Sequence, residues 1–215
     1  MSSSSDQPAT RFPVPAETRR VEETIKRSRF ITTVARAGTP DAARAIIARV
    51  RAEFPDATHH CWAYVAGAPG SSRAIGMSDD GEPHGTAGKP MLNVLMHGGV
   101  GEIVAVCTRY YGGVKLGTGG LSRAYASGVA NAIGCLPTTV KQEYVPLLVE
   151  VPYENAEAIQ RLANDLKVIV ENVTYGANVQ LDVLVPFEVQ SAFSSGVREV
   201  TRGRVSPTPR SGDAG

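Results

Sequence analysis

VAVCTRYYGGVKLGTGGLSRAYASGVANAI, residues 104–133, is the stretch that decides the fold. It opens with a short β-branched apolar run that suits a buried strand, and from Leu121 its apolar residues recur at the helical period. Between these two parts, five of the nine residues from Gly112 to Gly120 are glycine. The stretch therefore predicts a strand, a glycine-rich loop and a long helix, in that order.

The junction between loop and helix suits an anion. The first N–H groups of a helix lack intrahelical partners, and the helix dipole favours negative charge there. Thr118 is the expected N-cap, and the glycines after it leave an approaching phosphate or carboxylate unobstructed. The candidate anion-binding residues are Arg109, Gly112, Gly113, Lys115, Gly117, Thr118, Gly119, Gly120 and Arg123.

A packing role explains the same glycines, because a tight glycine turn lets a helix lie close to a sheet. The spacing of the glycines fits neither the P-loop nor GxGxxG in its usual frame. Anion binding and close packing therefore both stay open.

Composition narrows the class of protein. The chain has 215 residues and 42% hydrophobic content, which allows one large domain or two small ones. Its 22 Lys and Arg residues nearly cancel 21 Asp and Glu residues, so nucleic-acid binding needs a local basic patch. No signal peptide and no apolar run of roughly 20 residues is present. We expect a soluble cytoplasmic protein with reduced cysteines and no membrane partner.

The first half predicts the order β α β β α β α, within a domain of residues 17–138. Thr39, Pro40 and Asp41 form a helix start, and Pro55 ends that helix. The expected strands are 26–35, 59–65, 73–77 and 103–107, and the expected helices are 40–54, 88–96 and 119–133.

The second half predicts a separate domain over residues 144–205. Strands at 145–151, 168–173, 179–185 and 197–205 and helices at 154–166 and about 187–193 give β α β β α β, the split βαβ or ferredoxin-like arrangement. The Ser- and Pro-rich ends, 1–16 and 206–215, are expected to be disordered tails. The predicted fold class is α+β with two domains.

A second loop, residues 78–88, concentrates carboxylates, a histidine and glycines. Its candidate polar-rim residues are Asp79, Asp80, Glu82 and His84. With His59 or His60 they offer oxygen and nitrogen ligands, but the spacing matches no zinc or calcium loop. We expect these carboxylates to pair with cations or N–H groups of the glycine-rich loop, without a metal or cofactor.

No catalytic constellation emerges from the residues. Ser122 and Ser127 lack a GxSxG elbow, and no spacing brings Cys61 together with a histidine. The residues alone therefore favour a binding protein over an enzyme.

Three stretches resemble the Impact/YigZ family: HHCWAY (59–64), SDDGEPHGTAGKPML (78–92) and TRYYGGVKLGTGGLSRAY (108–125). The resemblance covers roughly residues 20–135. It implies that the first domain has the fold of the second domain of small-subunit ribosomal protein five. The second half resembles the extra C-terminal domain of bacterial members, itself similar to the last domain of elongation factor G.

The resemblance also implies a function. Eukaryotic relatives regulate translation under amino-acid starvation, and the family brings no agreed reaction with it. Our first hypothesis is a non-enzymatic, translation-linked regulator that binds RNA, a ribosome or a translation factor, with Arg109, Lys115 and Arg123 on phosphates. The alternative is an enzyme or sensor that holds a small phosphorylated or carboxylated ligand between the two glycine-rich loops.

Overall fold

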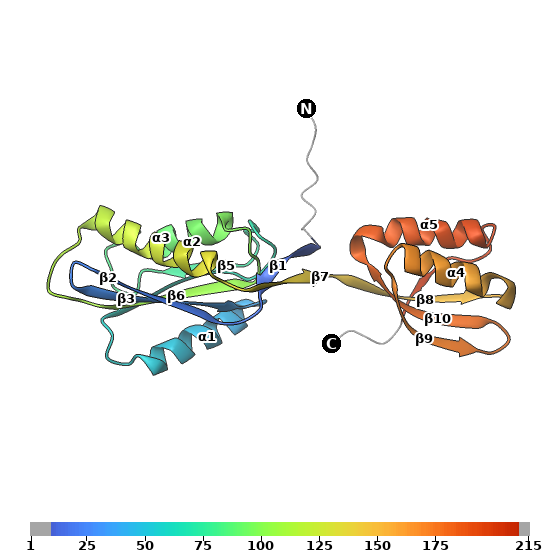
Figure 1. Ribbon diagram of the computed structural model, residues 1–215, viewed down its shortest axis with the longest axis horizontal. Helices are drawn as coiled ribbons and strands as arrows, with labels where there is room; N and C mark the ends of the chain where they lie inside the picture. The colour runs from blue at the N-terminus through green and yellow to red at the C-terminus, as the bar shows by residue number, and fades with distance from the viewer. Residues whose placement is uncertain (1–9, 211–215) are drawn as a thin grey trace, which may run out of the picture. The chain divides into compact units, whose positions relative to one another are not determined.

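The computed structural model describes residues 10–210. The chain divides into two compact units, one ending at Lys141 and the other beginning at Gln142. Each unit packs helices against a β-sheet, which confirms the predicted mixed α and β class with two domains (Figure 1). No helix within residues 10–210 is long and apolar enough to cross a membrane.

The first unit is built on a five-stranded antiparallel sheet in the order β2-β3-β6-β4-β5. The predicted strand at 103–107 is its central strand, because an apolar run buried on both faces has to lie inside a sheet. The strands are β2 (Arg19–Ile25), β3 (Ser28–Arg36), β4 (His59–Val65), β5 (Ile75–Ser78) and β6 (Ile103–Tyr110).

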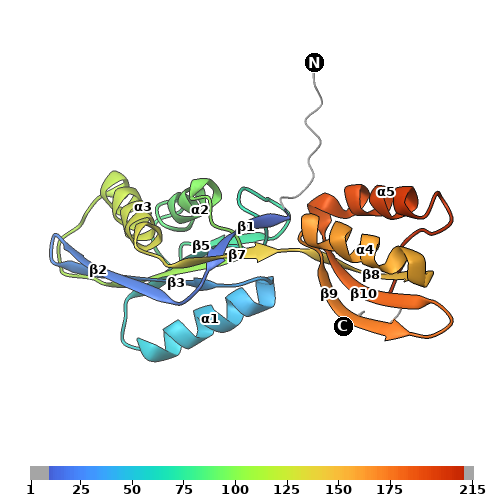
Figure 2. The ribbon, with the colours of Figure 1, turned by 45° about the vertical axis from the view of Figure 1, so that its right-hand side comes forward.

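Helices cover both faces of this sheet (Figures 1 and 2). The helices α2 (Gly88–His97) and α3 (Thr118–Gly134) pack on one face, where Ala105 and Cys107 join their core. The helix α1 (Pro40–Glu53) packs on the other face against Val104 and Val106. Alternate residues of β6 thus serve two cores, which is why β6 reads as a continuous apolar run.

Three elements near the N-terminus differ from the sequence prediction, and one of them, β2, lies at residues for which the sequence predicts no strand. Residues 11–15 lie in a predicted disordered tail, yet β1 (Arg11–Pro15) forms a two-stranded sheet with β7 (Thr138–Gln142). Alternation explains β1, because Phe12 and Val14 are both buried. Likewise, the predicted strand 26–35 begins at Ser28, after a turn whose Lys26 and Arg27 have positive φ.

The second unit holds a four-stranded antiparallel sheet in the order β11-β8-β10-β9, with α4 and α5 on one face (Figure 1). Its elements are β8 (Tyr144–Val151), α4 (Tyr153–Asp165), β9 (Ile169–Tyr175), β10 (Val179–Pro186), the 3-10 helix η1 (Phe187–Val189), α5 (Gln190–Val200) and β11 (Thr208–Pro209).

The last strand of this sheet is not where the sequence predicts it. The predicted strand 197–205 begins inside α5, because Phe193, Val197 and Val200 recur at helical spacing toward the core. The strand that pairs with β8 is β11, within the segment 206–215 predicted as disordered. Residues 211–215 of that segment lie outside the described part of the chain.

Candidate anion-binding site

A cleft of about 510 Å³ opens between two loops of the first unit. We call residues 78–88 the acidic loop and residues 111–117 the glycine loop. The acidic loop contributes Glu82 and Pro83 to the cleft, and the glycine loop and first turn of α3 contribute Tyr111, Lys115 and Thr118. Both loops follow strands of one sheet, β5 and β6, so the two segments meet although about 30 residues separate them.

The helix α3 starts without a side-chain cap at the edge of this cleft. Gly117 is the N-cap, with φ 75°, a conformation that glycine adopts without strain. Thr118 is therefore the first helical residue, not the predicted N-cap. The N–H of Leu121 bonds to the carbonyl of Gly117 at 2.9 Å. The N–H groups of the three preceding residues have no protein acceptor within residues 10–210.

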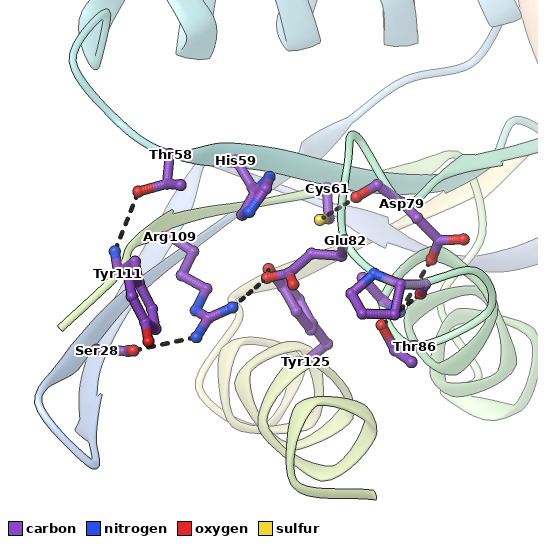
Figure 3. A network of polar contacts seen from close by, with 12 residues as sticks. Ser28, Thr58, His59, Cys61, Asp79, Glu82, Thr86, Arg109, Tyr111 and Tyr125 are labelled. Carbon is purple, nitrogen blue, oxygen red and sulfur yellow. Dashed lines mark hydrogen bonds and ion pairs between the residues drawn. The ribbon is translucent and has the colours of Figure 1, made fainter. Parts of the chain in front are cut away.

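Arg109 lines the cleft, but it is buried and its side chain points toward Glu82 and Ser28 (Figure 3). Its guanidinium donates to Glu82 at 2.5 Å and to the hydroxyl of Ser28 at 3.2 Å. Its Nε has no hydrogen-bond partner in the described structure. The hydroxyl of Tyr125 on α3 donates to the same carboxylate at 2.7 Å, and burial raises the pKa of Tyr125. The buried charges therefore neutralise each other and tie β6, the acidic loop and α3 together.

The three predicted cations do not converge. Lys115 is exposed and lines the cleft, whereas Arg123 is exposed in a separate depression that it shares with Lys26. Sequence reasoning missed the turn at Lys26 and Arg27. The contact that reveals this turn joins two segments far apart in the sequence. A Cβ added at Gly112 would lie 2.0 Å from the carbonyl oxygen of Arg27, so the glycine loop packs directly on the turn. Of the exposed cations, Lys115 thus lies in the cleft at the start of α3, and Lys26 and Arg123 lie in the neighbouring depression.

Asp79 holds the acidic loop closed. Its carboxylate accepts N–H groups from Gly85 at 2.7 Å, Ala87 at 3.0 Å and Gly88 at 2.8 Å. Burial opposes ionisation of Asp79, but the three amide hydrogen bonds favour the charged form and leave its pKa below the ordinary value. The side chain therefore caps the start of α2 instead of facing a ligand.

Asp80 connects the acidic loop to the opposite layer. Its carboxylate accepts the backbone N–H of His60 at 2.7 Å and an ion pair from Arg51 of α1. Its carbonyl lies 2.8 Å from Nδ1 of His59, a residue that lines the cleft. Within residues 10–210, the expected pairing of the acidic loop with cations near the glycine loop thus holds for Glu82 with Arg109 only.

The other histidines take different positions. His84 is fully exposed, with Nδ1 3.8 Å from Asp79. His60 is buried against the hydroxyl of Thr108 at 3.1 Å, and burial lowers its pKa. Among residues 10–210, no three His, Cys, Asp or Glu side chains gather into a group suited to a metal ion.

The buried cysteines have the properties of core residues. Cys61 donates its thiol to the carbonyl of Asp79 at 2.9 Å, and burial raises its pKa. Burial also raises the pKa of Cys107 to about 12. Both thiols therefore stay protonated near neutral pH, a state that is unsuited to nucleophilic attack.

Comparison with known proteins gives the family. Residues 26–133 match the Impact N-terminal domain, and residues 149–204 match a domain of unknown function, DUF1949. The chain is 47% identical over 190 residues to the IMPACT family member YigZ of Escherichia coli (strain K12), covering 88% of this chain and 93% of that protein. It is 33% identical to the IMPACT family member YvyE of Bacillus subtilis (strain 168), covering 85% of this chain and 83% of YvyE.

Among solved structures, a crystal structure of a hypothetical protein is 44% identical in sequence. It superposes with a TM-score of 0.66 and covers 95% of this chain and 99% of its own. The domain matches and the relatives together span both units of the chain. The protein is therefore a member of the IMPACT family.

Proposed function

We propose that this protein is a non-enzymatic cytoplasmic regulator linked to translation, and that it binds RNA through phosphates at the start of α3. The single observation that carries the proposal is the uncapped helix start, whose first N–H groups have no protein acceptor within residues 10–210. Such groups, together with the helix dipole, favour a phosphate oxygen.

Charge around this helix start supports the same proposal. Lys115 is exposed in the cleft at the helix start, and Lys26 and Arg123 are exposed in the neighbouring depression, although the whole chain carries a formal net charge of only +1. A local patch of this kind attracts a phosphate backbone without help from the bulk charge. Because Arg109 is committed to Glu82, its role in the proposal is to hold the cleft wall in place, and the exposed cations contact phosphates.

The two folds add weaker support. The strand order of the second unit, β11-β8-β10-β9 with antiparallel neighbours, is the order that a ferredoxin-like domain would have. We propose that relation, and for the first unit the relation to the second domain of small-subunit ribosomal protein five. Both relations agree with a partner in the translation machinery, which is RNA in this proposal.

A salt titration tests RNA binding. Fluorescence anisotropy with a labelled single-stranded 20-nucleotide RNA should give an affinity that falls steeply with salt concentration. The double variant Lys115→Ala, Arg123→Ala should bind more weakly and lower the salt slope by about 1.4, because each single-strand phosphate contact contributes roughly 0.7.

A matched variant controls for charge. Arg44→Ala, Arg49→Ala removes two exposed positive charges from α1, on the opposite face of the sheet. It should leave the affinity and the salt slope within twofold of the wild type. RNA binding that is insensitive to salt, or equal in both double variants, contradicts the proposal.

The shape of the cleft favours a second candidate, a sensor for a small phosphorylated or carboxylated ligand. The cleft combines the apolar Leu121 and the half-exposed ring of Tyr111 with Lys115 and the open amides. A thermal-shift panel of inorganic phosphate, mononucleotides and phosphosugars tests it, since binding at 100 times Kd adds about 2.7 kcal/mol of stability. A panel without any concentration-dependent rise in Tm removes this candidate and leaves RNA binding untouched.

A further inference from the structure

The sheet of the first unit ends at β5, whose outer edge is open. Among the described strands, β5 pairs with β4 alone. Just beyond that pairing, the N–H of Ala66 bonds to the carbonyl of Ala74 at 2.8 Å. Bonded and non-bonded positions alternate in an antiparallel pair, so the N–H and C=O groups of Ile75 and Met77 point away from β4. No other backbone group within residues 10–210 pairs with them.

An apolar groove of about 610 Å³ runs along this open edge, between β5 and α2. Ile75 and Met77 line it from the strand, and Leu92 and Met96 line it from the helix. The two strand residues, Ile75 and Met77, are 38% and 49% exposed. Edge strands are usually protected by charges, proline or a covering segment. An edge with open hydrogen-bonding groups and exposed apolar side chains is therefore a surface suited to a partner strand.

The charges at the groove indicate the chemistry of that partner. Lys89, at the start of α2, is exposed and has no ion pair in the described structure, and His97 lies at the other end of the helix. None of the described residues that line the groove is acidic. A partner segment that carries a carboxylate next to its apolar residues complements this surface.

We infer that the groove binds an extended, acidic segment of a partner protein, which adds to β5 as a strand. Main-chain hydrogen bonds to Ile75 and Met77 supply affinity, and apolar side chains at alternate positions of the segment enter the groove. A carboxylate beside them pairs with Lys89. This surface is separate from the cleft at α3, so the inference does not depend on RNA binding.

A second copy of the chain is a poorer occupant. Two β5 strands paired edge to edge would bring two grooves together, each with an exposed Lys89 and neither with an acid among its described lining residues. A second copy therefore offers no carboxylate to the Lys89 of the first. A dimer is therefore an outcome that would overturn the inference.

Selection from a random 12-residue phage-displayed peptide library on the full chain tests this inference. We expect enriched peptides with apolar residues at alternate positions next to Asp or Glu. Two variants probe the two kinds of contact. Met77→Lys places a charge in the groove, and Ile75→Pro removes an outward N–H without a loss to the β4 ladder. Each variant should bind the selected synthetic peptides at least tenfold more weakly than the wild type does, as measured by fluorescence anisotropy.

The control is Val140→Lys, which changes another exposed apolar side chain of the same unit, on β7. It should leave peptide affinity within twofold, and Met77→Lys should leave RNA binding unchanged. Circular dichroism melting checks that every variant folds. Three results overturn the inference. The first is a selection that enriches no peptide beyond those found on the Met77→Lys variant, and the second is enriched peptides that bind both groove variants as tightly as the wild type. The third is a wild-type dimer, seen by sedimentation, that the Met77→Lys substitution dissociates.

Discussion

The acidic loop and the glycine loop lie on either side of one cleft, yet their polar groups are used in opposite ways. In the acidic loop, the carboxylates of Asp79, Asp80 and Glu82 are all engaged by groups of the protein. At the end of the glycine loop, the first N–H groups of α3 have no acceptor within the described chain, and Lys115 is exposed. The charged side chains of the acidic loop are thus used to hold the fold together, whereas the glycine loop leaves backbone N–H groups available to a ligand.

Loss of Glu82 should have the largest effect. Glu82→Ala leaves the guanidinium of Arg109 buried without its counter-ion and removes the acceptor of Tyr125. Breaking a buried pair by removing one partner costs about 3–5 kcal/mol. Urea denaturation followed by circular dichroism should show this loss in the free energy of unfolding.

A double variant tests whether the lost stability comes from the unpaired buried charge of Arg109. Glu82→Met, Arg109→Met removes both buried charges, so it should be more stable than Glu82→Ala. In contrast, Lys115→Ala on the glycine loop should change stability by less than about 0.5 kcal/mol. If Glu82→Ala were as mild as Lys115→Ala, the acidic loop would not have the structural role that its contacts indicate.

Asp79→Asn should have the next largest effect. The substitution removes the charge that attracts three amide N–H groups, and hydrogen bonds to a charged group contribute about 1.5–3 kcal/mol. The loop should loosen while the amides at α3 stay open. Hydrogen exchange of Gly85 and Gly88 should accelerate in the variant more than exchange in β6.

The same residue gives a pH dependence with a definite sign. The folded pKa of Asp79 is lowered, so its contribution is complete above the unfolded value, about 3.9, and is lost as the pH falls through the folded pKa. The difference in unfolding free energy between the wild type and Asp79→Asn should therefore shrink with falling pH below about 4. A difference that grows on acidification contradicts the assigned role of Asp79.

Much of the fold is predictable from local patterns, because the apolar periods of β6, α1 and α3 each point to a core. Thr39 is confirmed as the cap of α1, since its hydroxyl accepts the N–H of Ala42 at 3.1 Å. The strands β1 and β11 are short and lie in Pro-rich ends. Pairing with distant strands, not propensity, creates them.

The candidate site is only partly predictable, because its key pairing joins residues 27 positions apart. The sequence predicts that the acidic loop pairs with cations near the glycine loop, but not that Glu82 takes Arg109 into the interior, so it assigns Arg109 to the surface with Lys115. Both loops were recognisable from their glycines and charges. Tertiary contacts decide which of the two loops has polar groups without a partner in the described protein, and these contacts are not visible in the sequence.

A matched pair of glycines compares the two loops directly. Gly117 has φ 75° and Gly85 has φ 76°, and a Cβ at either position meets no atom within 4 Å. Gly117→Ala and Gly85→Ala should therefore cost similar stability, about 1–2 kcal/mol each, through backbone strain alone. Only Gly117→Ala alters the helix start at the cleft, so it alone should weaken RNA binding in the anisotropy measurement. Equal effects on binding would mean that the helix start has no special part in it.

The smallest effect is expected at Thr118, and it tests why the helix start is open. The hydroxyl of Thr118 caps no N–H group, so Thr118→Ala should change the unfolding free energy by less than about 0.5 kcal/mol. Thr39→Ala removes a true cap from α1 and should cost about 1 kcal/mol. Thermal and urea unfolding of both variants measure the contrast. A cost at Thr118 equal to that at Thr39 would mean that the hydroxyl does satisfy an amide in solution, and a phosphate would then have to displace it before binding.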